Sequence, residues 1–266
     1  MSVYIHGGLR SPIGVLNGQY KHMRPEILGS QVIDEIINRY TISHIDGIFC
    51  GNAVGTGGNL GRLMGLMCNL PNSVPAITVD MQCASALMSI EIAYAHIVSG
   101  IMDSAIAGGI ESSSLQPERV YASGDDREGP YKVAQFTPQD QSPLAMLKGA
   151  ERTIHKHNVT KEDLYPHIIG SHQRASAALD NPYLQSYIMP ITIDGKRCID
   201  ECIRPTMNEK LLSRMKPLLG ADSITNAGNA CLTHDGAAFV YLSNKKGPFK
   251  IHSVKPWAGN PQFSPE

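Results

Sequence analysis

Residues 77–114, ITVDMQCASALMSIEIAYAHIVSGIMDSAIAGGIESSS, decide the fold of this chain. Residues 77–79 are typical of a short strand, and a helical pattern starts directly after Cys83. The apolar positions of that helix recur at steps of three and four residues: Leu87, Ile90, Tyr94, Ile97, Val98 and Ile101. Alanines fill much of the remaining surface, which predicts a central helix that ends near Gly100. Residues 104–107 then predict a buried strand that runs into two glycines.

Cys83 is the candidate nucleophile because it lies at or beside the N-terminus of this predicted helix. Unpaired backbone N–H groups and the helix dipole at such a place favour the thiolate form of a cysteine. A turn from strand to helix would also present the sulfur from a rigid scaffold. The alternative is a small buried residue without chemistry, since free cysteine is among the residue types most often buried.

Composition limits the class of protein. The chain has 266 residues, 42% hydrophobic and 18% charged, which is enough for one large or two modest domains. The net charge of −1 implies no broad basic field for nucleic acid. The chain contains no run of eighteen apolar residues, so the sequence predicts no membrane span. The first residues lack a signal-peptide layout and the last are not a peroxisomal Ser-Lys-Leu, so we expect a cytoplasmic protein.

The cysteines do not predict a metal site or a disulfide scaffold. None of them forms a CxxC pair, and no histidine lies near Cys198 and Cys202 at metal-ligand spacing. Scattered cysteines of this kind are typical of a reduced cytosolic protein. The six are Cys50, Cys68, Cys83, Cys198, Cys202 and Cys231.

The rest of the chain alternates strands and helices before and after an irregular stretch. Up to residue 114 the order is strand, helix, strand, helix, strand, helix, strand, which predicts a mainly parallel sheet covered by helices. Residues 115–145 lack periodicity. Further elements are expected as follows: strands at 3–6, 45–54 and 239–242, helices at 27–40, 63–70, 146–157 and 160–179, a hairpin over 188–199, and a strand from 249. The glycine-rich residues 55–61 lack the Gly-Lys-Ser/Thr ending of a phosphate loop.

Two motifs give the chain a strong resemblance to the thiolases. Residues 81–87, MQCASAL, resemble the nucleophile segment of that family, and residues 107–114, AGGIESSS, resemble its A-G-G-x-E-S-M-S segment. Weaker similarities continue along the chain, and they are RSPIG at 10–14, GTGGNLGR at 55–62, DECIRPT at 200–206, NAGN at 226–229 and DGAA at 235–238. The departures are Asp80, Ala86, Ser113, Cys231 and His234, each at a place where thiolases carry another residue.

The resemblance implies an α/β fold, a thiolase-like layered arrangement with a mainly parallel mixed sheet. It covers almost all of this sequence but only about two-thirds of a family member. Residues 1–114 and 221–245 would form the N-terminal core, residues 115–220 an inserted loop domain over the CoA site, and residues 246–266 the start of a C-terminal half. Only the N-terminal half and the loop domain would then be present.

The resemblance also implies acyl-CoA C-acyltransfer in lipid and fatty acid metabolism. Cys83 would attack an acyl-CoA and carry the acyl group as a thioester, for Claisen condensation or for thiolytic cleavage of a 3-oxoacyl-CoA. Arg204 and Cys231 would contact CoA, which is a substrate, so we expect no cofactor and no metal. The alternatives are a salt bridge from Arg204 to Asp200 or Glu201, and a buried packing role for Cys231. The expected partners are acyl-CoA and further copies in a homodimer or tetramer, with no nucleic acid and no membrane.

Three family segments have no counterpart here, namely N-E-A-F/H, G-H-P-x-G-x-S-G and C-x-G-G-G. In thiolases the second supplies the histidine that activates the nucleophile, and the third supplies the cysteine that moves the proton of the second substrate. His96 lies thirteen residues after Cys83, about 20 Å away at helical rise, so it cannot replace that histidine. We therefore expect an incomplete enzyme, with a non-catalytic remnant or assembly subunit as the alternative. A condensing enzyme that uses acyl-carrier protein or makes 3-hydroxy-3-methylglutaryl-CoA is a third reading, which the loop-domain match disfavours.

Overall fold

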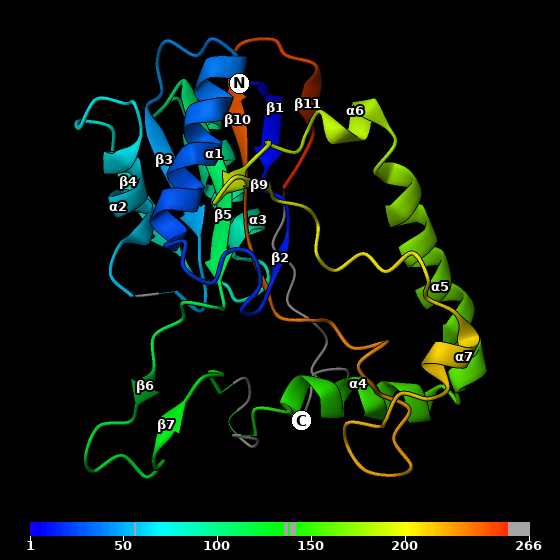
Figure 1. The fold of residues 1–266 in the computed structure, drawn as a ribbon. Coiled ribbons are helices and arrows are strands. Elements are labelled where there is room, and N and C mark those ends of the chain that lie inside the picture. Colours follow the sequence, from blue (N-terminus) through cyan, green and yellow to red (C-terminus); the bar gives the residue numbers. More distant parts are fainter. Residues whose placement is uncertain (56, 136–137, 139–141, 255–266) are drawn as a thin grey trace. The chain divides into compact units, whose positions relative to one another are not determined.

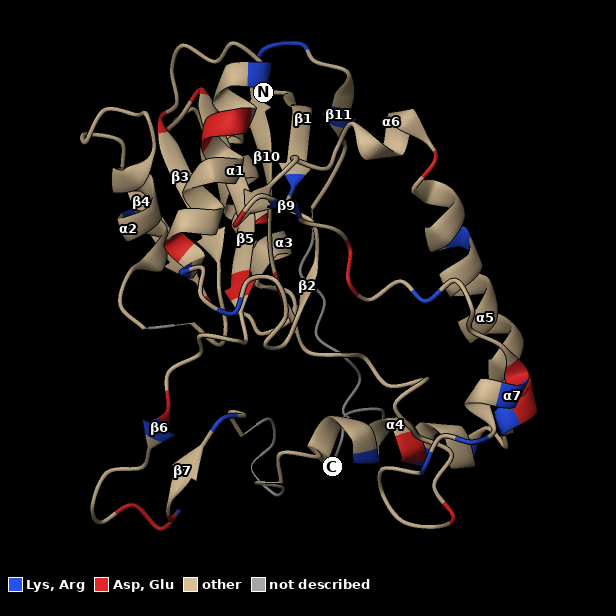
Figure 2. Ribbon diagram, viewed as in Figure 1, with Lys and Arg blue, Asp and Glu red and all other residues tan. Residues whose placement is uncertain are grey.

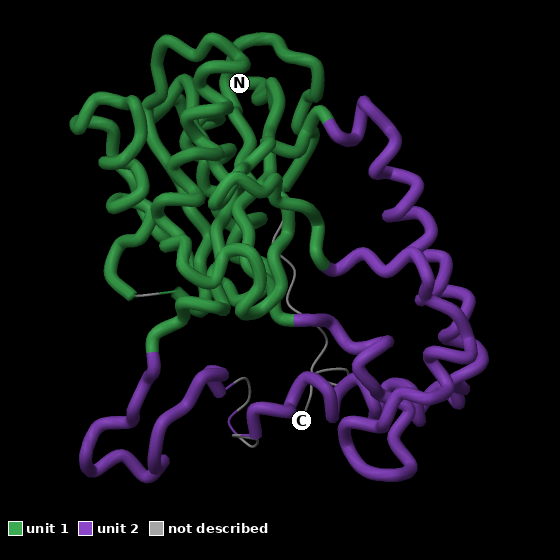
Figure 3. Tube along the Cα trace, in the orientation of Figure 1, with its two compact units in different colours: residues 1–117, 186–201, 233–256 green, residues 118–185, 202–232, 257–266 purple. Residues whose placement is uncertain are grey.

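A computed structural model describes residues 1–55, 57–135, 138 and 142–254 of the chain (Figure 1). The chain divides into two compact units, coloured separately in Figure 3. Of the described residues, unit 1 comprises those within 1–117, 186–201 and 233–254, and unit 2 comprises those within 118–185 and 202–232. Each unit is therefore assembled from segments that are far apart in the sequence.

Unit 1 is built on a seven-stranded sheet whose central path runs β11-β1-β10-β5-β3-β4, with β2 paired to β10. The strands are β1 (Val3–Arg10), β2 (Gly14–Val15), β3 (Gly47–Gly51), β4 (Ala76–Val79), β5 (Ser104–Ser112), β10 (His234–Ser243) and β11 (Phe249–Ile251). A separate hairpin of β8 (Thr192–Ile193) and β9 (Lys196–Arg197) also belongs to this unit.

The sheet is mixed, as expected, but it is not mainly parallel. Parallel pairing joins β3 to β4 and β3 to β5, whereas β10 is antiparallel to β1, β2 and β5, and β11 is antiparallel to β1. The reason is connectivity. The chain enters β10 from unit 2 and not through a crossover helix on the sheet, so the constraint that makes successive strands parallel does not apply.

Helices cover both faces of this sheet. The helices α1 (Pro25–Arg39) and α2 (Leu60–Met67) pack on one face, and α3 (Ser85–Val98) packs on the other. The period-2 alternation of β5 supplies both cores, because Ile106 and Ile110 join the cluster with α1 while Ala105 and Ala107 join the cluster with α3. The expected layered α/β arrangement is confirmed for this unit.

Unit 2 is mainly helical. It contains α4 (Ala145–Lys156), α5 (Lys161–Ala178), α6 (Pro182–Gln185), α7 (Glu209–Leu212) and a short hairpin of β6 (Arg119–Val120) and β7 (Pro130–Tyr131). The start of α5 is a capping box, because the Thr160 hydroxyl accepts from the Asp163 N–H while the Asp163 carboxylate accepts from the Thr160 N–H. Outside that hairpin, the described part of residues 115–145 is irregular up to the start of α4.

Two boundaries of the predicted domains differ from the structure. Residues 186–201 belong to unit 1 and not to the loop domain, because Met189, Ile191 and Cys198 are buried in the core cluster beneath α1. Residues 221–232 belong to unit 2 and not to the sheet core, because Glu151 of α4 binds the backbone of residues 224 and 225. Of the predicted C-terminal segment, residues 249–251 pair with β1 as β11, and residues 255–266 lie outside the described residues.

Charge is distributed without a dominant sign. Figure 2 shows acidic and basic residues interspersed, for example on α5 and α7, in keeping with the net charge of −1. Among the helices of the described residues, none has the length and hydropathy needed to cross a membrane.

Candidate active site around Cys83

Cys83 lies in an exposed turn between β4 and α3. The turn is tight, since the Ala84 N–H donates to the Met81 carbonyl at 3.1 Å and the Ser85 N–H donates to the Gln82 carbonyl at 3.0 Å. Gln82 has a φ of 51°, in the left-handed region that few residues other than glycine adopt. The predicted strand-to-helix turn is therefore present, with a strained residue directly before the cysteine.

Ser85 holds this turn in place. Its Oγ accepts a hydrogen bond from the Met81 N–H at 2.8 Å and donates one to the Gln82 carbonyl at 2.5 Å. The hydroxyl thus satisfies two backbone groups on either side of the strained residue. The sequence analysis did not assign Ser85 a role, although its place two residues after Cys83 inside the quoted motif was the available signal.

Glycines bring the first turn of α3 against the sheet. A Cβ at Gly51, the last residue of β3, would lie 2.4 Å from the Ala86 nitrogen and 2.5 Å from the Ser85 carbonyl carbon. A Cβ at Gly109 in β5 would lie 3.1 Å from the Ala86 Cβ. Only a residue without a side chain allows such an approach at Gly51. The turn that carries Cys83 therefore sits at the carboxyl ends of the parallel strands, where α/β proteins commonly bind ligands.

A buried carboxylate organises the same edge of the sheet. Glu111 of β5 accepts hydrogen bonds from the Asn52 side-chain amide at 2.7 Å and from the N–H groups of Ala53 and Val54 at 2.9 and 3.1 Å. Burial raises the pKa of Glu111, and these hydrogen bonds only partly oppose that shift. This network fixes the loop that follows β3. The sequence analysis did not predict the hydrogen bonds between Glu111 and residues 52–54.

The AGGIESSS and DGAA segments also meet in space. Asp235, at the start of β10, is buried and accepts hydrogen bonds from the N–H of Ser114, at 2.9 Å, and from its hydroxyl. Asp235 is also the register partner of Ser112. The AGGIESSS and DGAA segments, separated by more than a hundred residues, therefore form one structural element.

The Cys83 thiol has no hydrogen-bond partner among residues 1–55, 57–135 and 142–254. His96 is used elsewhere, since its Nδ1 lies 2.8 Å from the Ile92 carbonyl and its ring packs on Phe49 at 5.3 Å. This agrees with the expectation that His96 is not the base for the thiol. The thiol is exposed and free to meet a ligand, beside the positive end of the α3 dipole.

Arg204 lies in unit 2 and is exposed, and its backbone N–H donates to Nδ1 of His172 at 3.2 Å. The alternative of a salt bridge to Asp200 or Glu201 is not observed, because other groups hold both carboxylates. Asp200 binds the Arg10 guanidinium, and Glu201 accepts from the N–H groups of Val15 and Gln19. The Arg204 guanidinium is thus not committed to either acid.

Cys231 is exposed, so the alternative of a buried packing role is not observed. Its thiol lies 3.3 Å from the Leu232 carbonyl, a local contact at the end of unit 2. The turn before it is held by Asn229, whose side-chain Oδ1 accepts from the Asn226 N–H at 2.8 Å. The residues proposed for catalysis and for CoA therefore lie in different units, with Cys83 in unit 1 and Arg204 and Cys231 in unit 2.

A second carboxylate orders this part of unit 2. Glu151 of α4 accepts hydrogen bonds from the Ser223 hydroxyl at 3.0 Å, the Ile224 N–H at 2.8 Å, the Thr225 N–H at 3.1 Å and the Thr225 hydroxyl. Burial raises the pKa of Glu151, but the hydrogen bonds outweigh it, so the pKa is lowered overall. The carboxylate fixes the segment that leads to Asn226 and Cys231.

Comparison with known proteins identifies relatives that match most of the chain. Residues 3–246 match the family model described as thiolase, N-terminal domain. A Staphylococcus epidermidis protein named "Putative acetyl-CoA C-acetyltransferase VraB" is 33% identical over 245 residues, covering 88% of this chain and 62% of the relative. The protein of the same name from Staphylococcus aureus is 31% identical over 249 residues, covering 91% of this chain and 65% of the relative.

Solved structures agree with this match. The Bacillus anthracis acetyl-CoA acetyltransferase superposes with a TM-score of 0.82 at 25% identity, over 91% of this chain and 65% of that one. Human mitochondrial 3-ketoacyl-CoA thiolase in complex with CoA gives the same TM-score and identity, over 91% of this chain and 64% of that one. The chain thus spans less than two-thirds of the length of these relatives.

Proposed function

This chain belongs to the thiolase family, and from that premise we propose that it accepts acyl groups from acyl-CoA as a thioester on Cys83. The observation that carries the proposal is the exposed thiol on a strained strand-to-helix turn, inside the segment that resembles the thiolase nucleophile motif. The Cys83 thiolate attacks the acyl carbonyl carbon, the bond from that carbon to the CoA sulfur breaks, and CoA leaves as a thiolate that takes up a proton.

The second half of the reaction returns the thiolate. In the synthetic direction, acetyl-CoA loses a proton to a base, and the resulting carbanion attacks the Cys83 thioester to form a 3-oxoacyl-CoA. In the degradative direction, CoA cleaves a 3-oxoacyl-CoA through the same thioester. No redox cofactor is needed, since CoA thioesters supply both substrates.

The general acid/base groups are proposed to lie outside this chain's nucleophile-bearing part. The chain spans 62–65% of the length of its curated relatives, and the Cys83 thiol has no partner among residues 1–55, 57–135 and 142–254. Formation of the acyl-enzyme joins only the Cys83 thiolate and the acyl donor, and an activating base would accelerate this step, whereas carbon–carbon bond formation requires a base for the second substrate. We therefore expect acylation by this chain alone, and full turnover only with the remaining part of a thiolase.

Intact mass spectrometry after incubation with acetyl-CoA or acetoacetyl-CoA tests this proposal. The wild-type chain should gain the mass of one acyl group, and Cys83→Ala should gain none. Cys231→Ala is the matched control, because Cys231 is the other exposed cysteine and its loss should leave the mass gain unchanged. A folded chain that is not acylated, or one acylated at Cys231, would contradict the proposal and favour a non-catalytic remnant or assembly subunit.

Arg204 is proposed to bind the nucleotide end of CoA, since a guanidinium stacks on rings and pairs with phosphate. Arg204→Ala should weaken CoA binding about tenfold in calorimetry, the effect of one charge-assisted contact. Arg214→Ala is the control, because Arg214 is an equally exposed arginine of unit 2 that lies outside the DECIRPT segment. Equal weakening by both changes would show that general charge and not a specific contact is involved.

A homodimer through the β4 edge is also proposed. β4 is the last strand of the sheet path, and beside it Leu63, Leu66, Met67 and Ile77 are each more than 40% exposed. An unpaired edge with apolar flanks favours pairing with another chain. Sedimentation should show a dimer that Leu63→Glu dissociates.

A further inference from the structure

His234 is one of the positions at which this chain departs from the thiolases. It is the first residue of β10, and it is half-buried. Within the part of the chain that the structure describes, its imidazole has no hydrogen-bond or ion-pair partner. An imidazole in its neutral form has one nitrogen that can take up a proton, and at His234 no other group of the described residues occupies it.

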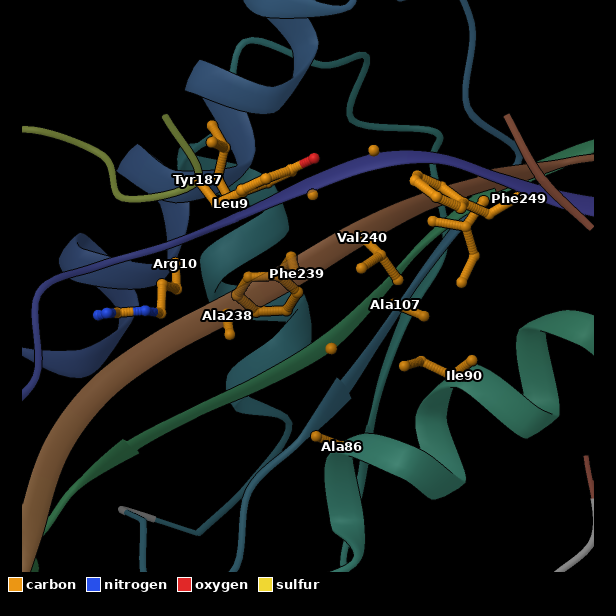
Figure 4. Close-up of a pocket in the computed structure, with 14 residues that line it drawn as sticks. Leu9, Arg10, Ala86, Ile90, Ala107, Tyr187, Ala238, Phe239, Val240 and Phe249 are labelled. Atoms are coloured by element: carbon orange, nitrogen blue, oxygen red, sulfur yellow. The ribbon is translucent and has the colours of Figure 1, made fainter. Parts of the chain in front are cut away.

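β10 directs the His234 side chain toward the face of the sheet that carries α3. Successive side chains of a strand point to opposite faces, and Leu242 packs in the cluster with α3 whereas Phe239 packs in the cluster with α1. Figure 4 shows the groove that Ala238 of β10 lines together with Ala86 of α3. The register of β10 with β5 and β2 shows no shift, so the same alternation places His234 on the α3 face.

His234 also lies at the edge of the sheet where the Cys83 turn sits. A Cβ at Gly109 would lie 3.1 Å from the Ala86 Cβ, and Ala238 is the register partner of Gly109. From that row His234 is four residues further along β10, about 13 Å, and Cys83 is three residues before Ala86 in the same direction, about 5 Å at helical rise. About 8 Å along the strands and about 5 Å across them therefore remain between the two backbone positions, a gap that the two side chains span directly or through one water.

A carboxylate beside His234 favours an imidazolium there. Glu111 of β5 is the register partner of Gly236, so it lies diagonally across from His234 on the same face, about 7–8 Å away. The Glu111 oxygens already accept hydrogen bonds from residues 52–54. Glu111 therefore acts on His234 as a fixed negative charge, which stabilises the protonated ring.

The other elements around His234 add no opposing charge. β2 presents the apolar Val15 opposite His234. The turn before α3 contributes Asp80, whose carboxylate accepts from the Gln82 N–H at 2.8 Å. Lysine and arginine are absent from the neighbouring stretches of sequence, which are residues 11–19, 80–86, 109–113 and 233–238. A proton that moves from the thiol to His234 therefore enters a region of negative charge.

We infer that His234 is the general base for the acylation of Cys83. Its free nitrogen takes the thiol proton, directly or through one water, as the Cys83 sulfur attacks the acyl carbonyl carbon. When the bond from that carbon to the CoA sulfur breaks, the imidazolium gives the proton to the leaving CoA thiolate. The imidazole is then neutral again and the acyl group stays on Cys83, so protons and charges balance.

The inference rests on the proposed function and adds a catalytic residue to its first half-reaction. His234 comes 151 residues after Cys83, outside the segment 77–114 that bears the nucleophile. It serves the exchange of one thioester for another. The base that removes a proton from the second substrate is a separate group, and it is still proposed to lie in the remaining part of a thiolase.

The rate of acylation by acetyl-CoA, followed by intact mass at several pH values, tests this role. In the wild-type chain the rate should rise between about pH 5.5 and about pH 7.5, the range in which histidines lose their proton. His234→Asn keeps a polar side chain without a basic nitrogen. It should lose this step and acylate at least about tenfold more slowly at pH 7. The acetyl-CoA concentration that gives half the maximal rate should change less than about twofold, because the proton moves only in the chemical step.

Two further variants separate a base from a structural residue. His234→Ala should be slow in the same way, and free imidazole in solution should restore at least about a tenth of the wild-type rate. His44→Asn is the matched control, because His44 is an exposed histidine of the same unit that precedes β3, at the opposite edge of the sheet. It should be acylated like the wild type. The circular dichroism of all three variants should match that of the wild type.

The inference is overturned by a folded His234→Asn chain that keeps the wild-type rate and pH step. It is also overturned if imidazole leaves His234→Ala slow, or if His44→Asn is slowed as much as His234→Asn. In each of these cases a wild-type chain that is acylated leaves the proposed function standing.

Alkylation of Cys83 by iodoacetamide distinguishes the remaining case, since it needs no CoA. A wild-type chain that acetyl-CoA does not acylate would remove the proposed function. If its alkylation still shows a pH step that His234→Asn lacks, His234 remains the base for the thiol. If the two chains are alkylated with the same pH dependence, this inference falls as well.

Discussion

The guanidinium of Arg10 and the carboxylate of Asp200 form two parallel hydrogen bonds of 2.8 and 2.7 Å, although 190 residues separate them in the sequence. The pair is half-buried, with side chains 34% and 10% exposed. Asp200 also accepts from the Ile13 N–H at 2.7 Å, and the next residue, Glu201, holds Val15 and Gln19. This double contact ties the second segment of unit 1 to the end of β1.

Asp200→Asn should therefore destabilise unit 1 by about 1–3 kcal/mol, because it breaks the bidentate pair and leaves a partly buried guanidinium without its partner. Urea unfolding followed by the fluorescence of the aromatic residues measures the change. Glu91→Gln is the control, since it removes a carboxylate from the same unit at a residue of α3 without a side-chain partner. Equal loss in the two variants would contradict a specific role for the pair.

The same pair predicts sensitivity to acid. Burial raises the pKa of Asp200. The hydrogen bonds from Arg10 and from the Ile13 N–H, together with the positive charge of Arg10, outweigh burial, so the pKa lies below its ordinary value. Such a group stabilises the fold above the unfolded pKa of about 3.9, and that stabilisation is lost as the pH falls through the folded-state pKa. The stability difference between wild type and Asp200→Asn should thus shrink from about pH 6 to about pH 3. A difference that stays constant over this range would show that the charge is not involved.

Glu151→Gln should loosen residues 223–226 within unit 2. The glutamine NH₂ group would face hydrogen-bond donors that now bind the Glu151 carboxylate. We expect this change to lower the stability of the segment by about 2–3 kcal/mol. Hydrogen exchange at Ile224 and Thr225 should become faster, because glutamine keeps a single oxygen for the two N–H groups that now donate to separate oxygens of Glu151. Glu162→Gln, an exposed change in the first turn of α5, should leave the exchange rates as they are. Protection that survives in Glu151→Gln would mean that other contacts order the segment.

Gly51→Ala should displace the turn that carries Cys83. The added Cβ would meet backbone atoms of Ser85 and Ala86, which cannot move without shifting the first turn of α3. We expect a loss of about 2 kcal/mol or more and slower acylation of Cys83. Gly65→Ala is the matched control, because its Cβ would meet no backbone atom but the end of the Ile48 side chain at 3.2 Å and the Ala76 Cβ at 3.5 Å, and alanine favours the helix. Both are measured by thermal unfolding and by the rate of mass gain.

Gln82 provides a test of backbone strain beside the nucleophile. Gln82→Gly should be nearly neutral, since relief at a φ of 51° offsets the entropy that glycine adds to the unfolded chain. Gln82→Val should cost about 1–2 kcal/mol, because a β-branched residue resists this conformation. Thermal unfolding of the two variants separates the outcomes. A valine variant as stable as the glycine variant would show that the turn relaxes easily.

The sequence patterns predicted the helices better than the strands. The apolar periods placed α1 and α3 to within two residues. For α3 the predicted face was wrong, because its buried residues are Ser85, Ser89, Ala93 and Ile97, while Leu87 and Ile101 of the predicted period are exposed. β10 was predicted only from residue 239, yet it starts at His234. Its first part, His-Asp-Gly-Ala-Ala, has little strand propensity of its own, and pairing with β5 on one side and β1 on the other makes it a strand.

The parts of the site that lie in a recognisable motif were predictable from the sequence, but the parts that depend on the backbone conformation were not. Cys83 stood out by its place between a strand and a helix. The left-handed conformation of Gln82 and the hydrogen bond from the Met81 N–H to the Ser85 hydroxyl depend on the path of the backbone. Neither residue type indicates that path in the sequence. The grouping of residues 186–201 with unit 1 was also hidden, because it depends on contacts such as Arg10–Asp200 between distant segments.

The central place of β10 in the sheet has a consequence for how the protein is made. β1 and β5 flank it, and both leave the ribosome long before residue 234 does. Until then the two strands have unsatisfied edges facing a gap that only the late-arriving strand can fill. Nascent chains of this protein should therefore remain incompletely folded and prone to aggregation through most of their synthesis, and should depend on chaperones until β10 has been made.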